Sequence, residues 1–292
     1  MTQGRVEGAA VDLPPLRNPV MLAAFEGWND AGEAASGAVA HLQQVWQATP
    51  VAEFDPEGYH DFQVNRPVVA LDAEGRRKLT WPTTRIYVAS PPDAVRDIVL
   101  VRGIEPSMRW RAYCSELLGL ADDLGVTQLI TLAALLADVP HTRPIPVTGT
   151  SEHPGLRTTF GVEGSTYEGS TGIVGVLQDA ALDAGLPGLS LWAAVPHYVG
   201  QPPSPKATLA LLRRVEETLD VIVPLGDLPE DARAWEHGVD ELAEEDGEIG
   251  AYVRQLEEAK DTVDLPEASG EAIAREFERY LRRRGDEPPA RG

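Results

Sequence analysis

The stretch that decides the fold lies at residues 19–33 and reads PVMLAAFEGWNDAGE. The segment from Val20 to Phe25 is a short apolar run bounded by Pro19 and Gly27, which is typical of a strand covered on both faces. Apolar residues then recur at helical spacing, at Ala35, Ala38, Val39, Leu42, Val45 and Trp46. The stretch therefore predicts a buried strand, a polar turn and a helix in direct succession.

The polar turn carries the chemistry of this stretch. Asp30, with Glu33 three residues later, resembles a capping box at the start of the helix. A helix start offers free backbone N–H groups and the positive end of a dipole, but Glu26 and Asp30 place two carboxylates at the same point. This combination favours a cationic or hydrogen-bonding partner over a phosphate.

Composition excludes several classes of partner. The chain has 292 residues and a formal charge of −21, from 46 acidic and 25 basic side chains, so it repels the phosphate backbone of nucleic acids. Its 43% apolar content suffices for a sizeable core. No apolar run approaches the ~20 residues that cross a bilayer, and the N-terminus lacks a signal pattern. We therefore expect no nucleic acid, no membrane and a cytoplasmic location.

Catalytic and metal-binding motifs do not emerge from the sequence. Cys114 is the single cysteine, and the six histidines show no metal-ligand spacing with it, so we expect neither metal nor cofactor. Cys114 lies near the apolar stripe of a predicted helix, which indicates a buried structural thiol. Neither Gly-x-Ser-x-Gly nor Gly-x-x-x-x-Gly-Lys is present, and Ser170-Thr171 is more simply a helix cap. We assign no catalytic residue.

The order of elements predicts a layered α/β fold. Residues 51–89 hold short β-like runs, with a turn from Asp72 to Gly75, and this part is expected to be antiparallel. From residue 97 strands alternate with helices, as in an α/β layered sheet. The fold class is therefore α/β, a three-layer α/β/α arrangement with a mixed sheet, plus a C-terminal helical appendage.

Four segments follow from composition and periodicity. Residues 1–17 are a flexible arm, 18–226 the α/β core, 227–284 an acidic helical appendage and 285–292 a disordered tail. The appendage helices have narrow apolar faces, so they must pack against the core or against another subunit. We therefore expect a homo-oligomer, with a trimer as the predicted state.

Uncommon polar side chains follow directly after several predicted strands. Loops at the carboxyl ends of parallel strands meet at one edge of an open sheet, where ligand crevices form. Each side chain also has a local explanation as a cap or a loop contact. The candidate residues of a ligand-binding or partner-facing crevice are Glu26, Trp28, Asn29, Asp30, Glu105, Thr142, Arg143, His197 and Tyr198.

Five motifs together resemble the proteasome assembly chaperone 2 family. They are Glu26 to Gly32, Gly103 to Pro106, Pro140 to Pro144, Tyr167 to Gly169 with Gly172 to Gly175, and Val195 to Tyr198, in order over residues 19–223. The resemblance implies a three-layer fold similar to nucleoside phosphorylases, homo-oligomers, and binding of proteasome α-subunits. Archaeal-type members bind through a tail that ends in a hydrophobic-Tyr-any motif, whereas this chain ends Pro288-Pro289-Ala290-Arg291-Gly292.

Two functions follow from these observations. The first is a non-catalytic interaction protein whose oligomeric core binds protein partners, proteasome subunits among them. The alternative is a small-molecule enzyme, a hydrolase, a phosphorylase-like enzyme or a ligase, that uses the crevice at the strand ends.

Overall fold

The computed structural model describes residues 15–92 and 94–264. Most of the predicted arm, residues 265–284 of the predicted appendage, and the predicted tail lie outside these residues. Arg17, which the sequence assigns to the arm, contacts the core: its backbone N–H and its guanidinium donate to the two carboxylate oxygens of Asp97, at 2.6 and 2.7 Å.

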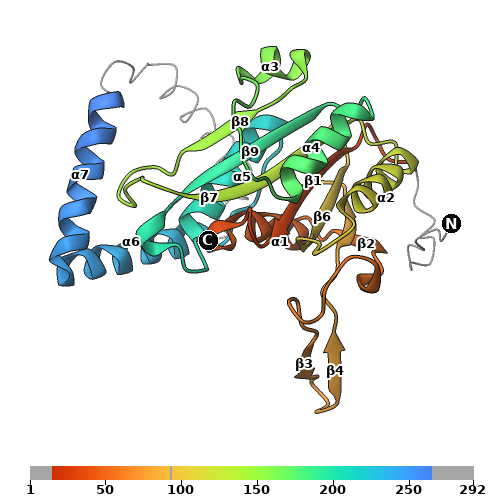
Figure 1. Cartoon of the computed structure of the whole chain (residues 1–292), viewed down its shortest axis with the longest axis horizontal. Coiled ribbons are helices and arrows are strands. Elements are labelled where there is room, and N and C mark those ends of the chain that lie inside the picture. The colour runs from red at the N-terminus through yellow and green to blue at the C-terminus, as the bar shows by residue number, and fades with distance from the viewer. Residues whose placement is uncertain (1–14, 93, 265–292) are drawn as a thin grey trace, which may run out of the picture.

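A seven-stranded mixed sheet forms the centre of the molecule (Figure 1). The strand order is β2-β5-β6-β1-β7-β9-β8, in which β6, β1, β7 and β9 are parallel to one another, whereas β2 pairs with β5, β5 with β6 and β8 with β9 in antiparallel fashion. The bounds are β1 Val20–Glu26, β2 Thr49–Glu53, β5 Arg85–Ala89, β6 Ile98–Ile104, β7 Gln128–Ala137, β8 Val147–Thr150 and β9 Gly188–Pro196. The predicted buried strand at residues 20–25 is thus the central strand of the sheet, which explains why it is apolar on both faces.

Helices cover both faces of this sheet. Helices α1 (Ala34–Val45) and α5 (Pro205–Leu219) pack on one face with the even-numbered residues of β1, such as Leu22. Helices α2 (Trp110–Asp123) and α4 (Ile173–Asp183) pack on the other face with the odd-numbered residues, such as Met21. This is the predicted three-layer α/β/α fold with a mixed sheet.

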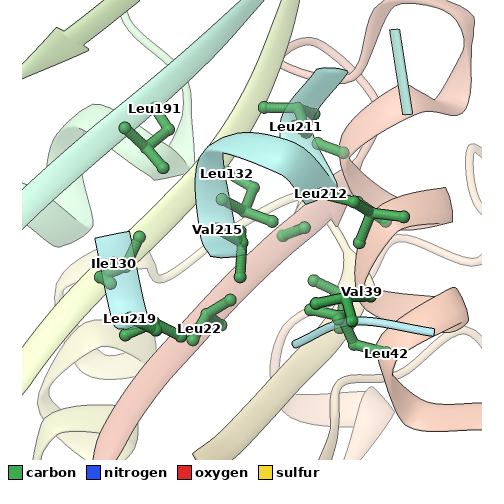
Figure 2. Packing of buried hydrophobic residues seen from close by; sticks show 14 of the residues in the cluster. Leu22, Val39, Leu42, Ile130, Leu132, Leu191, Leu211, Leu212, Val215 and Leu219 are labelled. Carbon is green, nitrogen blue, oxygen red and sulfur yellow. The ribbon is translucent and has the colours of Figure 1, made fainter. Parts of the chain in front are cut away.

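The layer between the sheet and α5 is built from aliphatic side chains (Figure 2). Leu132 and Leu191, from β7 and β9, are fully buried there with Leu212 and Val215 from α5. Complete burial of one such side chain stabilises the folded state by about 1.5–3 kcal/mol. The single cysteine, Cys114, lies buried in the opposite layer, as the sequence predicts.

Residues 49–89 contain the predicted antiparallel strands in two places. Strands β2 and β5 join the edge of the main sheet, whereas β3 (Val68–Leu71) and β4 (Arg77–Thr80) form a separate hairpin. Its turn is closed by backbone hydrogen bonds between Asp72 and both Gly75 and Arg76, at the predicted position. The sequence analysis missed strand β8 and the short helix α3 (Pro154–Phe160), because both are only partly buried and lack an apolar run.

Two acidic helices follow the sheet domain. Helix α6 (Leu228–Glu245) packs against α5, and α7 (Gly247–Asp264) packs against α6 (Figure 1). Neither of these, nor any other helix within residues 15–92 and 94–264, is long and apolar enough to cross a membrane.

Candidate functional site

The predicted site residues follow the carboxyl ends of the four parallel strands. Glu26 ends β1, Glu105 follows β6, Thr142 and Arg143 follow β7, and His197 follows β9. The structure divides the nine predicted residues into two groups, because β6 and β9 are separated by β1 and β7. Three strand spacings of about 4.8 Å place the ends of β6 and β9 about 14 Å apart.

The first group surrounds the start of α4. The Oε1 atom of Glu105 accepts a hydrogen bond of 2.8 Å from the backbone N–H of Ile173, the first residue of that helix. Glu105 therefore caps α4. The predicted cap at Ser170-Thr171 is wrong, because the N-cap residue of α4 is Gly172 and no side-chain cap hydrogen bond is made there. Glu26 forms an ion pair of 3.4 Å with Arg102.

Gly172 lets this group assemble. A Cβ atom at this position would lie 2.0 Å from Oδ1 of Asn29 and 2.7 Å from Oε1 of Glu105, closer than carbon and oxygen approach each other. The glycine thus allows the loop after β1, the loop after β6 and the start of α4 to meet. The buried Oδ1 of Asn29 has no hydrogen-bond partner in the described parts of the chain.

Asp30 caps α1 in a way that differs from the predicted capping box. A 3-10 turn at Ala31–Glu33 precedes α1, and Glu33 has a left-handed backbone with φ of 51°. The Oδ1 atom of Asp30 spans this turn and accepts from the N–H groups of Ala35 (2.7 Å) and Ser36 (3.2 Å). Burial raises the pKa of Asp30, since a charged carboxylate is poorly solvated there. Its Oδ2 has no partner among the described residues.

Four exposed apolar side chains lie at the end of a β-strand or in loops between elements. Trp28, in the loop after β1, is 73% exposed, and Tyr167, in the loop that leads to α4, is 69% exposed. Leu136 lies at the end of β7, two residues beyond the bridge between Asp30 and Ala134, and Met108 follows β6. We call Trp28, Met108, Leu136 and Tyr167 the edge rim.

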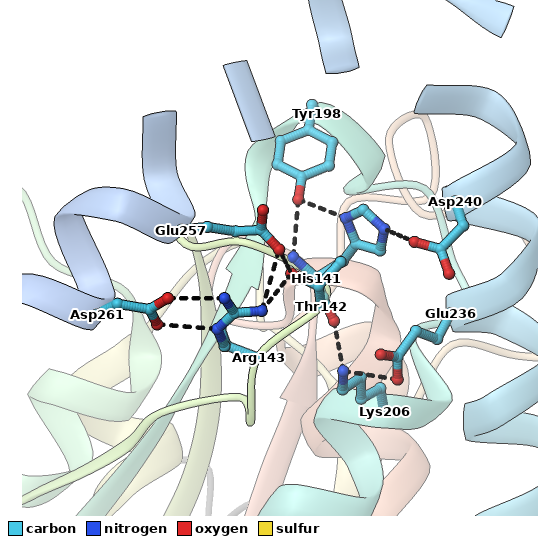
Figure 3. Close-up of polar contacts among 9 residues, drawn as sticks. All are labelled: His141, Thr142, Arg143, Tyr198, Lys206, Glu236, Asp240, Glu257 and Asp261. Atoms are coloured by element: carbon cyan, nitrogen blue, oxygen red, sulfur yellow. Dashed lines mark hydrogen bonds and ion pairs between the residues drawn. The ribbon is translucent and has the colours of Figure 1, made fainter. Parts of the chain in front are cut away.

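The second group holds α7 on the sheet domain (Figure 3). Arg143 donates from Nε and Nη2 to the two carboxylate oxygens of Asp261, at 2.9 and 2.8 Å, and from Nη1 to Glu257 at 3.0 Å. Thr142 donates to the same oxygen of Glu257. The hydrogen bonds from Arg143 lower the pKa of Asp261. Thr142 and Arg143 are therefore committed to α7 and do not line a crevice with Glu105.

His141 holds α6 in the same way, although the sequence analysis did not select it. Its side chain is fully buried, with Nδ1 at 2.8 Å from the hydroxyl of Tyr198 and Nε2 at 3.0 Å from Asp240 of α6. Burial raises the pKa of Tyr198 to about 12. Lys206 adds a further tie, since its ammonium contacts the carbonyl of His141 and, at 2.7 Å, Glu236 of α6 (Figure 3).

His197 lies beside α7 rather than beside Glu105. Its Nδ1 is 3.2 Å from Asp138, which also accepts a hydrogen bond of 3.1 Å from Tyr252 of α7. The rings of His197 and Tyr252 are 5.4 Å apart in an edge-to-face arrangement. The sequence correctly predicts that these residues lie at the strand ends. The motifs within residues 19–223 could not predict their contacts with α6 and α7, because these helices lie 30 to 120 residues further along the chain.

The described residues offer little for covalent or metal chemistry. Within residues 15–92 and 94–264, no group of three or more His, Cys, Asp or Glu side chains has a geometry for a metal ion. Burial raises the pKa of the Cys114 thiol to about 11, so this sulfur is a poor nucleophile at neutral pH.

Comparison with known proteins identifies the family of this chain. The sequence profile of the PAC2 family matches residues 24–243, from β1 into α6. The chain belongs to the PAC2 family. A crystal structure of a PAC2 family protein from Streptomyces avermitilis is 61% identical, with a TM-score of 0.76, over 80% of this chain and 99% of the other. A search of curated proteins gives no match.

Two further solved structures are similar to this chain. A proteasome-assembly chaperone homologue from Mycobacterium tuberculosis is 55% identical, with a TM-score of 0.74, over 80% of this chain and 99% of its own. An archaeal proteasome activator from Pyrococcus furiosus is 20% identical with a TM-score of 0.64, over 80% of this chain and 97% of its own, and so shares the fold.

Proposed function

We propose that this PAC2 family protein is a non-catalytic interaction protein, and that its homo-oligomeric core binds protein partners, proteasome subunits among them, in the cytoplasm. The proposal rests on the structural contacts that the polar side chains at the strand ends make. Asp30 and Glu105 cap helices, and Thr142 and Arg143 hold α7. The groups that a catalytic crevice would use are thus engaged in structure.

The edge rim is the surface we assign to the partner. Exposed apolar patches mark protein-binding sites, and aromatic and methionine side chains are enriched in the cores of interfaces. Trp28 and Tyr167 supply two such aromatic anchors, and Glu26 supplies a carboxylate beside them. The partner face is therefore expected to combine an apolar centre with basic side chains at its margin.

The comparisons support a partner from the proteasome. The names of two relatives, a proteasome-assembly chaperone homologue and an archaeal proteasome activator, connect the fold with that assembly. Binding is expected to use the folded core or the acidic helices.

A pull-down from native cytoplasm tests the proposal. The baits are the full chain, a chain without residues 285–292, and the double variant Trp28→Ala/Tyr167→Ala. We expect proteasome subunits, identified by mass spectrometry, with the first two baits and at least a tenfold loss with the third. The matched control is Val95→Ala/Leu182→Ala, which removes two exposed apolar side chains away from the edge rim. Recovery of no proteasome subunit with the full chain contradicts the proposal.

One observation favours the alternative, a small-molecule enzyme. Asn29 and Asp30 are both more than nine-tenths buried, and each keeps one oxygen without a partner in the described chain. Buried acceptors are normally satisfied, so a ligand with N–H or O–H donors would complete them. Turnover of a metabolite by the pure protein, together with a failed pull-down, would favour the enzyme.

A further inference from the structure

A cavity of about 530 Å³ lies between helices α5 and α6, and residues of the loop that joins β7 to β8 also line it. We call it the α5–α6 cavity. Its volume is within the range of about 300–1,000 Å³ that small-molecule sites occupy. Of the nine residues that the sequence selects as a crevice, only Thr142 lines this cavity. The α5–α6 cavity is therefore a feature that neither the edge rim nor the strand-end residues explain.

The α5–α6 cavity is cationic although the chain is acidic. In the whole chain 46 acidic side chains outnumber 25 basic ones. In the lining of the cavity the balance is reversed, with Lys206, Arg213, Arg214 and Arg233 against Glu217 and Glu236. A cleft that carries an excess of one charge raises the local concentration of ligands of the opposite charge. The lining therefore favours an anion.

Lys206 has a structural explanation. Its ammonium contacts the carbonyl of His141 and, at 2.7 Å, a carboxylate oxygen of Glu236 (Figure 3). Among the ion pairs within residues 15–92 and 94–264, this is the one that joins α5 to α6. Lys206 thus holds the two walls of the cavity together and needs no ligand.

The three arginines do not hold the walls together. Arg214 and Arg233 pair with glutamates of their own helices, at 2.9 and 3.8 Å, and Arg213 pairs with no residue that the structure describes. Exposed pairs of this kind contribute little to stability. The Nε atom of Arg214 is buried and has no hydrogen-bond partner in the described chain. Because buried donors are normally satisfied, an acceptor from a ligand is expected beside it.

The α5–α6 cavity also has an apolar surface. Ile145 from the loop, Leu209 from α5 and Ala232 from α6 all line it, and each of them is more than nine-tenths buried. Inorganic phosphate would contact the arginines but would leave this surface unused. A ligand that joins an anionic head to an apolar body would contact both parts of the lining.

We propose that the α5–α6 cavity binds an organic anion, either a carboxylate or a phosphate monoester, that carries an apolar body. The head accepts hydrogen bonds from Arg213, Arg214 and Arg233, since a guanidinium can donate two parallel hydrogen bonds to a carboxylate or a phosphate. The body lies on the apolar surface. The inference goes beyond the proposed function, because a protein partner at the edge rim does not use this cavity.

Isothermal titration calorimetry of the full chain tests the proposal with octanoate and octyl phosphate, which distinguish the two head groups. We expect one of these anions, or both, to bind about tenfold or more tightly than octanamide and octanol, because charge-assisted hydrogen bonds are the stronger ones. These two neutral molecules have the same chain length. Acetate and inorganic phosphate, which lack the apolar body, should bind more weakly as well.

Two variants test the two parts of the lining. Arg213→Gln/Arg233→Gln should weaken binding by about tenfold or more, since it removes two charged donors. Both side chains are exposed, so we expect the variant to fold, and circular dichroism checks this. Ala210→Phe keeps all the arginines but fills the cavity, and it should also weaken binding. The matched control Arg66→Gln/Arg111→Gln removes two exposed arginines outside the lining and should leave the affinity unchanged.

Three results overturn the inference: no binding of either anion, equal affinity for the anions and their neutral analogues, or an unchanged affinity in Arg213→Gln/Arg233→Gln. Binding of one anion alone upholds it and assigns the head group. Failure of this inference is distinct from failure of the proposed function, because the pull-down depends on the edge rim and the calorimetry on the α5–α6 cavity.

Discussion

Glu105, at the end of β6, caps the first turn of α4 by accepting the backbone N–H of Ile173 at 2.8 Å. The two residues are 68 positions apart in the sequence: Glu105 follows β6, and Ile173 is the first residue of α4. A carboxylate at a helix N-terminus is stabilised by the unpaired N–H groups and by the helix dipole. Glu105, which the sequence analysis selects as a site residue, therefore connects the loop after β6 to helix α4.

Replacement of Glu105 by Ala should destabilise the protein by about 1 kcal/mol, the typical cost of a lost helix cap. Glu105→Gln should cost less, because the amide oxygen still accepts the hydrogen bond while the charge is lost. Urea denaturation at neutral pH measures both values. Equal losses in the two variants would show that the charge, rather than the acceptor, matters at this position.

Gly172→Ala tests the close approach beside this cap. The new Cβ would meet Asn29 and Glu105, so the loop and the start of α4 must separate, at a cost of about 1–3 kcal/mol. Gly119→Ala is the matched control, since this glycine lies within α2 and a Cβ there meets no atom within 4 Å. The control should be stabilised by about 0.5–1 kcal/mol, because alanine favours the helix. Thermal and urea denaturation of the two variants should thus change in opposite directions.

The strands and helices of the sheet domain are predictable from the sequence because their signal is local. The run from Val20 to Phe25 is apolar on both faces because helices cover both faces of β1, and β3 (Val68–Leu71) and β5 (Arg85–Ala89) lie within residues 51–89, where short β-like runs are predicted. Where the core contributes little, as in β8, the local signal disappears.

The division of the site could not be predicted, since it depends on contacts between distant segments. Sequence position places Arg143 at a strand end, but only the fold shows that Asp261, 118 residues later, occupies its guanidinium. His141 lies within the motif Pro140 to Pro144, yet its full burial between Tyr198 and Asp240 follows from the packing of α6.

Arg143→Ala should release α7 while the sheet domain stays folded. The guanidinium makes the ion pairs to Glu257 and Asp261, so its loss removes both at once. Hydrogen exchange followed by mass spectrometry should show faster exchange in peptides of α7 and unchanged exchange in β1 and β7. Arg213→Ala, at an exposed position of α5, is the control. Unchanged protection of α7 in Arg143→Ala would contradict an anchoring role.

Asp30→Asn should make the protein less sensitive to rising pH. Burial raises the folded-state pKa of Asp30 above the ordinary value of 3.8, so the folded protein binds more protons than the unfolded chain between these two pKa values. Stability from this group is therefore lost as pH rises through that window. Asparagine keeps an oxygen for the N–H groups of Ala35 and Ser36 but does not ionise. The gain in unfolding free energy of Asp30→Asn over the native chain should thus grow as the pH rises above 3.8.

Asp72→Asn is the control with the opposite sign. Hydrogen bonds from the backbone of Arg76 lower the pKa of Asp72, so its contribution is present at neutral pH and is lost as pH falls. Relative to the native chain, this variant should lose stability at about pH 7 and approach it at acid pH. Urea denaturation of all three proteins across this range measures both trends. A difference for Asp30→Asn that does not change with pH would mean that Asp30 titrates alike in the folded and unfolded states.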